Sequence, residues 1–172
     1  VTVAWNDGGN ASHEVVLPQL RVVKGDVYVL ALGTLGGLSL PRLELVGGSV
    51  RLSALQPSAA VARATFPALE RVGGGVQIGG FDSHYGRIGP VVLGSIDAEL
   101  QIDGAVTVGG AAGSDVAAVD LPRVSRIGLN ASAWTSAVAI GVKAGGTIGE
   151  IRVNFDSNIT DLALNGGLSI VA

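Results

Sequence analysis

A short phrase recurs along the chain at nearly constant spacing, and this recurrence restricts the available folds more than any other feature. LPRLELVGGSVRL begins at Leu40, and FPALERVGGGVQI begins at Phe66. The proline-centred part of the phrase is found at Leu17-Pro18-Gln19-Leu20, Leu40-Pro41-Arg42-Leu43, Phe66-Pro67-Ala68-Leu69 and Leu121-Pro122-Arg123-Val124. The last gap is twice as long as the earlier ones, so it holds two periods. A fixed period of about 20 to 50 residues is typical of solenoids, whose repeats bury their apolar faces against their neighbours.

Two weaker copies extend the series. Leu93-Gly94-Ser95-Ile96, near the middle of the long gap, keeps the apolar positions without the proline, and Ile148-Gly149-Glu150-Ile151 has the same apolar spacing. The chain is therefore predicted to form about six turns of 23–28 residues, regular over residues 15–80 and degenerate over residues 90–172. We expect residues 1–172 to form a single β-solenoid repeat domain.

Alternating apolar residues predict two short strands in each period. The first begins ten residues after each of the first three copies and is less regular later, at Val27-x-Val29, Val50-x-Leu52, Val76-x-Ile78, Leu100-x-Ile102 or Val106-x-Val108, Val138-x-Ile140 and Leu168-x-Ile170. The second ends at or just before the proline, at Val15–Leu17, Leu38–Leu40, Ala64–Phe66 and Val119–Leu121. Such alternation is the period of a β-strand. We therefore expect an all-β, parallel β-solenoid with two strands and two corners per period and little α-helix.

Proline and glycine mark the two corners. Four of the six prolines occupy the same repeat position just after a strand, where a fixed φ and a missing N–H end the ladder. The pairs Gly47-Gly48 and Gly73-Gly74 mark the other corner. Glycine at this corner permits positive φ and lets successive turns stack closely.

The pattern LPxLxxVGGxVxI, carried by residues 40–52 and 66–78, resembles the receptor L-domain family and its fungal cell-wall and bacterial secreted relatives. The resemblance is close over residues 15–80 and loose over residues 90–172. It implies a right-handed β-helix related to leucine-rich repeats, in an extracellular module that binds ligands or contributes to cell-surface structure. The chain departs from the receptor members because it has no cysteine, which argues against a hormone-receptor role. The family supplies no catalytic residues.

Composition argues against several kinds of partner. The formal net charge is −3, and the eleven lysines and arginines are scattered singly or in pairs, so there is no basic patch for nucleic acid. The apolar runs are too short to cross a bilayer, and we expect no membrane span. Without cysteine there is no disulfide framework and no thiolate metal site. The absence of methionine suggests a processed mature form or a fragment of a longer protein.

One polar insertion is the most chemically varied segment. The stretch FDSHYG, between the third and fourth turns, contains Asp82, Ser83, His84 and Tyr85. Adjacent residues of one loop rarely reach the geometry of a Ser–His–Asp triad, and the sequence has no nucleophile-elbow motif. A plain surface loop is the simplest interpretation, and a loop that contacts a partner is the functional alternative.

Three of the six asparagines lie in N-x-S/T sequons, at Asn10, Asn130 and Asn158. This frequency suggests a eukaryotic secretory route and a glycoprotein that is secreted or held at the cell surface. Chance occurrence in loops that contain Ser and Thr is the alternative. Attached glycans would require these asparagines to face solvent.

The sequence offers no motif for a metal or cofactor. Calcium needs about six to eight oxygen ligands. The chain has no EF-hand loop and no GGxGxD run, and its acidic residues are dispersed, among them Asp97, Glu99, Asp103, Asp115, Asp120, Asp156 and Asp161. The polar turn WNDGGN at residues 5–10 is the alternative calcium site. We expect no metal and no cofactor.

These observations favour a non-enzymatic structural or adhesive repeat protein whose partner is another protein or a cell-surface glycan. Strand-like residues begin and end the chain, as VTVAW and GGLSIVA, which suggests either a piece of a longer solenoid or head-to-tail self-association. The runner-up hypothesis is a ligand-recognition module that binds a glycan or peptide on one face. An enzyme of the pectin-lyase type ranks third, because it needs charged residues clustered on one strand face, and Asp103, Asp120 and Asp156 do not share a repeat register.

Overall fold

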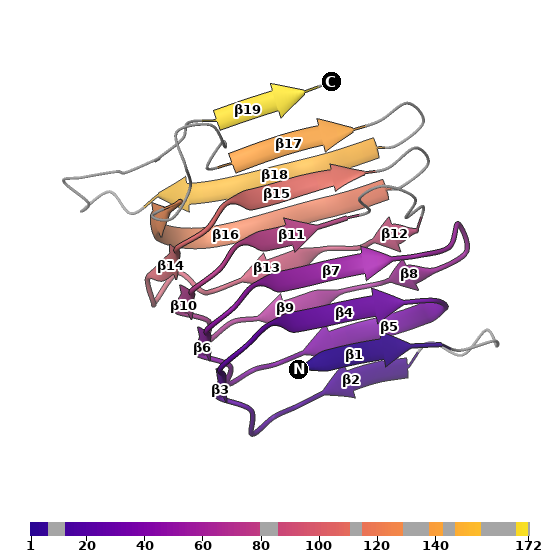
Figure 1. Cartoon of the computed structure of the whole chain (residues 1–172), viewed down its shortest axis with the longest axis horizontal. Helices are drawn as coiled ribbons and strands as arrows, with labels where there is room; N and C mark the ends of the chain where they lie inside the picture. The colour runs from indigo at the N-terminus through magenta and orange to yellow at the C-terminus, as the bar shows by residue number, and fades with distance from the viewer. Residues whose placement is uncertain are drawn as a thin grey trace.

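The computed structural model describes residues 1–6, 13–79, 86–110, 115–128, 138–142, 147–155 and 168–171. Within these residues the regular structure is entirely β-strand, with every pairing parallel and no helix. Two sheets face each other across a shared interior, and successive coils stack one on the next (Figure 1). This arrangement confirms the predicted all-β, parallel β-solenoid.

The first sheet takes one strand from each successive coil. Its strands, in spatial order, are β1 (Thr2–Trp5), β4 (Val27–Ala31), β7 (Val50–Ala54), β11 (Val76–Ile78), β15 (Val106–Gly110), β17 (Val138–Val142) and β19 (Leu168–Val171). Matched positions in neighbouring strands give the length of each step along the chain, and the pairs are Thr2 with Tyr28, Val27 with Val50, Val50 with Val76, Val76 with Val106, Val106 with Val138, and Val138 with Leu168. The predicted period is therefore right for the first three steps and too short for the last three.

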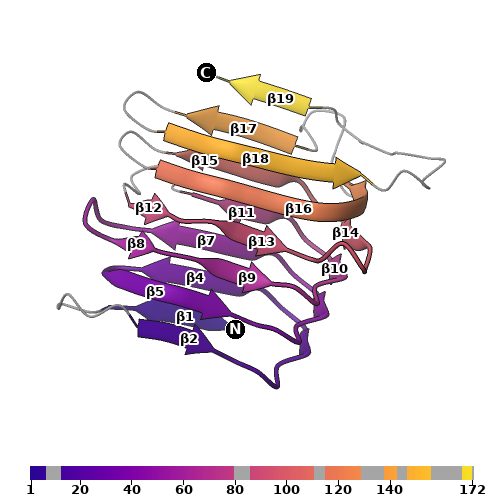
Figure 2. The ribbon, with the colours of Figure 1, turned by 180° about the vertical axis from the view of Figure 1, so that it is seen from behind.

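The second sheet has twelve strands and covers two further faces. Opposite the first sheet lie β2 (His13–Val16), β5 (Thr34–Ser39), β8 (Ala60–Val61), β9 (Ala64–Phe66), β12 (Arg87–Ile88), β13 (Val91–Leu93), β16 (Asp115–Ile127) and β18 (Thr147–Phe155). A third face is formed by β3 (Val22–Val23), β6 (Leu45–Val46), β10 (Arg71–Val72) and β14 (Leu100–Ile102). The long strand β16 joins the two faces, because it pairs with β13 and then bends to pair with β14 (Figure 2).

The third face corrects the expectation of two strands per period. Four coils carry a separate short strand there, so each of these coils has three faces. Three of these strands are only two residues long, too short for an alternation to stand out in the sequence. The fourth, β14, was found as Leu100-x-Ile102, but its assignment to the first sheet was wrong, because Val106–Val108 occupies that place. Each coil runs along the first sheet, crosses to the second and returns by the third face in a right-handed sense (Figures 1 and 2). This is the hand favoured when parallel strands are joined by a crossover.

The interior is made of aliphatic columns that run along the stack. Residues in register on neighbouring strands share one interior position, as Val27, Val50, Val76 and Val106 do in the first sheet. On the third face the last residue of each short strand points inward, and these residues form a buried column that continues into β16. The column consists of Val23, Val46, Val72, Ile102 and, in β16, Ile127. Like-on-like stacking of this kind explains why the core needs few aromatic side chains.

The proline corner is confirmed for three copies and wrong for the fourth. Pro18, Pro41 and Pro67 lie in turns that follow β2, β5 and β9. Pro122 instead lies inside β16, where the pairing with β18 shifts register between Leu121 and Val124. The strand absorbs this proline as an irregularity rather than ending at it.

The two weaker copies were placed partly wrongly. Leu93 does pair with Phe66, as the phrase requires, but Ile96 is 73% exposed. The corner after β13 is longer than its predecessors, and Leu100 is the residue that returns to the interior. Ile148 and Ile151 belong to β18, so that copy is a strand and not a corner.

The glycine corner is confirmed in its packing but not in its backbone conformation. Among the described glycines only Gly79, Gly94 and Gly128 have positive φ. A Cβ on Gly73 would lie 2.5 Å from the carbonyl oxygen of Gly47, in the coil before. Glycine is therefore required here because successive backbones approach too closely for a side chain.

Candidate functional site

Several predicted site residues lie outside the described part of the chain. This applies to the polar insertion Asp82, Ser83, His84 and Tyr85, and to the sequon asparagines Asn10, Asn130 and Asn158. Most of the turn at residues 5–10 also falls outside it. The partner-contact loop, the glycosylation sites and the calcium turn therefore stay predictions.

The described residues bring one charged surface together, on the third face. Its strand positions are the outward residues of β3, β6, β10 and β14, which are Val22, Leu45, Arg71 and Gln101. The corner residues Glu44, Glu70, Asp97 and Glu99 and the β16 residue Arg123 border these positions and line the rest of a groove of about 690 Å³. We call this surface the third-face groove. Its volume is within the range of about 300 to 1,000 Å³ that is usual for ligand sites.

The alternation of the short strands explains how the groove is formed. In each strand the residue that precedes the buried one points outward, as Leu45 does before Val46 and Arg71 before Val72. Because the strands are in parallel register, outward residues line up about 4.8 Å apart along the stack. A row of separate short strands thus builds one continuous surface.

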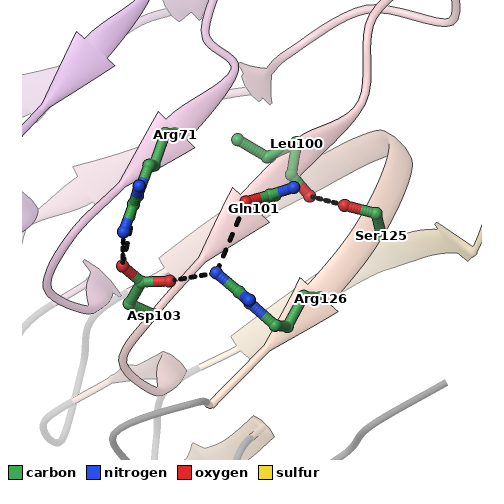
Figure 3. Close-up of polar contacts among 6 residues, drawn as sticks. All are labelled: Arg71, Leu100, Gln101, Asp103, Ser125 and Arg126. Atoms are coloured by element: carbon green, nitrogen blue, oxygen red, sulfur yellow. Dashed lines mark hydrogen bonds and ion pairs between the residues drawn. The ribbon is translucent and has the colours of Figure 1, made fainter. Parts of the chain in front are cut away.

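A buried carboxylate, that of Asp103, binds Arg71, which lines the groove. Arg71 donates from Nε and Nη2 to Oδ2 of Asp103, at 3.2 and 2.8 Å. Arg126 donates from Nη2 to Oδ1 of Asp103 at 2.8 Å and to Oε1 of Gln101 at 3.4 Å (Figure 3). The side chain of Asp103 is only 5% exposed, whereas those of Arg71 and Arg126 are 52% and 31% exposed.

These contacts set the ionisation of Asp103. Burial by itself raises the pKa of the Asp103 carboxyl, but the hydrogen bonds and positive charges of Arg71 and Arg126 outweigh burial. The pKa of Asp103 therefore lies below its ordinary value, and the group is ionised at neutral pH. Since both carboxylate oxygens accept arginine donors, Asp103 fixes the arginines in place.

The remaining charges of the groove are unevenly paired. Arg21 and Glu44 form an ion pair of 2.6 Å, and Arg123 lies 3.7 Å from Glu99. Glu70 and Asp97 are both exposed, and neither side chain has an ion-pair partner among the described residues. Arg123 donates from Nη1 to the backbone carbonyl of Asp97 at 3.4 Å, but the carboxylates of Glu70 and Asp97 themselves have no ion pair in the described part of the chain.

The structure separates the acidic residues that the sequence analysis considered together. Asp103 lies at the third-face corner, whereas Asp120 pairs with Val92 and Arg152 on the face opposite the first sheet. In the described ranges, no group of three or more acidic or histidine side chains is placed so that it could hold a metal ion. The described part also has no helix able to cross a membrane.

The sequence analysis missed the third-face groove. Its ion pairs join residues of neighbouring coils, with Arg71 and Asp103 separated by 32 residues and Asp103 and Arg126 by 23 residues. Opposite charges at period spacing were a usable signal, but the third strand of each coil had not been predicted. Without that strand the sequence gives no reason to place these residues on one face.

Comparisons with known proteins identified no relative of this chain. No protein-family model, curated protein or solved structure matches the chain. The resemblance to receptor L-domains therefore stays a prediction, and the function is argued from the geometry.

Proposed function

We propose that this chain is a non-enzymatic structural or adhesive repeat protein that acts outside the cell or at the cell surface. The observation that supports this best is how its charged side chains are used, because many of them join one coil to another. Arg21 binds Glu44, Arg63 binds Glu14, and Asp103 binds Arg71 and Arg126. A stack whose coils are joined to one another by ion pairs suits a rigid spacer or an adhesive surface.

Among the ion pairs of the described residues, Glu14–Arg63 joins the residues farthest apart in the sequence, 49 positions. Glu14 is in register with Gly37, and the pair passes over that glycine to reach the coil beyond. A Cβ on Gly37 would lie 3.3 Å from Cγ of Glu14, so the missing side chain leaves room for the bridge. Such bridging supports a role in which the stack must resist bending.

The extracellular setting rests on two features of the sequence. The first is the resemblance of residues 15–80 to receptor L-domains, and the second is the set of three sequons. In that setting the partner would be another protein or a cell-surface glycan.

Self-association through the ends of the stack is part of this proposal. β1 stands at the end of the strand order of the first sheet. The carbonyls of Val1 and Trp5 accept hydrogen bonds from the N–H groups of Tyr28 and Leu32, so these residues face β4. In a parallel strand the backbone groups of alternate residues face opposite sides, so the N–H of Ala4 points away from β4. A second copy could add its own coil there and continue both sheets head to tail.

Replacing Ala4 by proline tests this contact. Proline removes the outward N–H and is tolerated on edge strands, so Ala4→Pro should keep the fold and abolish association. Ala4→Ser keeps the N–H and serves as the matched control. Light scattering over a range of concentrations should give a rising mass for the wild type and for Ala4→Ser, and the 17.2 kDa monomer for Ala4→Pro. A wild-type monomer at every concentration would contradict head-to-tail association.

A ligand-recognition module is the second candidate function. The third-face groove favours it, because the groove combines an aliphatic strip, the fixed Arg71 and carboxylates that have no ion-pair partner among the described residues. This candidate would use one face of the same stack to bind a peptide or a glycan.

A further inference from the structure

We infer that the third-face groove binds an extended basic peptide, in which lysine or arginine side chains alternate with aliphatic ones. This inference rests on the ligand-recognition function proposed above and names the class of ligand. It is supported by three properties of the groove: an aliphatic strip, uncompensated carboxylates and an anchored arginine.

The aliphatic strip distinguishes a peptide from a glycan. Val22 is 52% exposed and is in register with Leu45 on the neighbouring strand, so the two form an apolar strip along the stack. No aromatic side chain is among the described residues that line the groove. Sugar rings are commonly bound against flat aromatic faces, which this groove lacks, whereas aliphatic side chains pack well on valine and leucine.

The carboxylates give the groove its preference for positive charge. Glu70 and Asp97 are exposed and have no ion-pair partner in the part of the chain that the structure describes. Glu99 makes a long contact of 3.7 Å with Arg123. A lysine or arginine side chain placed over Glu70 and Asp97 would be attracted to both, and an acidic ligand would be repelled.

Arg71 supplies a fixed donor for a peptide backbone. Its Nε and Nη2 bind the buried carboxylate of Asp103, which holds the guanidinium in one position at the groove. A guanidinium has five N–H donors, so others remain for a peptide carbonyl. Because Asp103 already orders this side chain, a ligand loses less entropy on binding to it.

The test uses the full chain and the blocked hexapeptide acetyl-Val-Lys-Val-Lys-Val-Lys-amide, titrated while backbone amide shifts are followed by NMR. We expect the largest shifts at Leu45, Arg71 and Gln101. The double variant Glu70→Gln, Asp97→Asn should bind the peptide at least about fivefold more weakly, and added salt should weaken wild-type binding as well. The matched control is Glu150→Gln, which removes an exposed carboxylate of β18, on the face opposite the first sheet and outside the groove, and which should bind as the wild type does.

Four results would overturn the inference. The first is equal affinity of the wild type and the double variant, with unchanged unfolding midpoints confirming that both are folded. The second is amide shifts confined to another face. The third is a chitin or β-glucan oligosaccharide that shifts the groove amides when the peptide does not; the recognition function would then stand with a different ligand. The fourth is that neither probe shifts any amide; the inference and the recognition function then fail together, and the structural role is untouched.

Discussion

At the scale of single residues, the stack is stabilised by side chains whose role can be understood only from the residues they contact in neighbouring coils. Asp103 occupies a corner position equivalent to that of Gly73 in the preceding coil, since both donate an N–H to a carbonyl one coil below. The sequence identifies Gly73 as a corner residue but offers no reason for an aspartate at the later position. That reason is Arg71 and Arg126, which reach Asp103 from the coils on either side.

Replacing Asp103 by asparagine should lower the free energy of unfolding by about 1 to 2 kcal/mol at neutral pH, since Arg71 and Arg126 lose a shared anion but remain partly solvated. The pKa of Asp103 is lowered in the folded state. Its stabilising effect is therefore complete above its unfolded pKa of about 3.9 and is lost as the pH falls through the folded pKa. Denaturant titrations should show a constant difference between wild type and Asp103→Asn near neutrality that shrinks in acid. A difference that grows as the pH falls would contradict this assignment.

Glycine at the stacking corner provides a second test. A Cβ at Gly73 would lie 2.5 Å from a backbone oxygen, whereas a Cβ at Gly25 would meet no atom within 4 Å. Gly73→Ala should therefore destabilise the fold by about 1 to 3 kcal/mol. Gly25→Ala should change stability by no more than about 0.5 kcal/mol. Equal effects of the two substitutions in thermal or chemical unfolding would mean that close stacking is not why glycine occurs at this corner.

At the scale of elements, the strands with clear alternation were predicted and the shortest strands were not. β4, β7 and β11 match the alternating triplets found in the sequence. Three of the four third-face strands were missed because a pair such as Leu45-Val46 looks the same in a strand as in a loop. The fourth, Leu100–Ile102, was found as an alternating triplet but assigned to the wrong face. Corner lengths were also hidden, since nothing in the phrase shows that residues 94–99 form a longer connection before β14.

The longer corner allows a test of whether Leu93–Ile96 was aligned correctly with the earlier copies of the phrase. The alignment places Ile96 at an interior position, but the structure exposes Ile96 and buries Leu100 completely. Leu100→Ala should cost about 2 to 5 kcal/mol of stability, as expected for a leucine removed from a core. Ile96→Ala should cost no more than about 0.5 kcal/mol. The opposite ranking in denaturant unfolding would restore the original alignment.

At the scale of the whole molecule, the period was the most informative property of the sequence. Copies of one phrase at nearly constant spacing were enough to predict a parallel solenoid, and the first half of the stack follows that spacing. The second half was predicted less well, because its steps are longer, as from Val76 to Val106 and from Val106 to Val138, and its proline lies inside a strand. Added residues at a corner leave the stacked strands in register, so the fold tolerates a drift in period that obscures the repeat in the sequence.

Electron microscopy of the concentrated protein tests the proposed structural role most directly. If separate copies stack end to end through β1, the wild type should form unbranched filaments one molecule wide, and Ala4→Pro should give only single particles. Dispersed wild-type particles at every concentration, with the fold intact, would contradict self-association as the basis of that role.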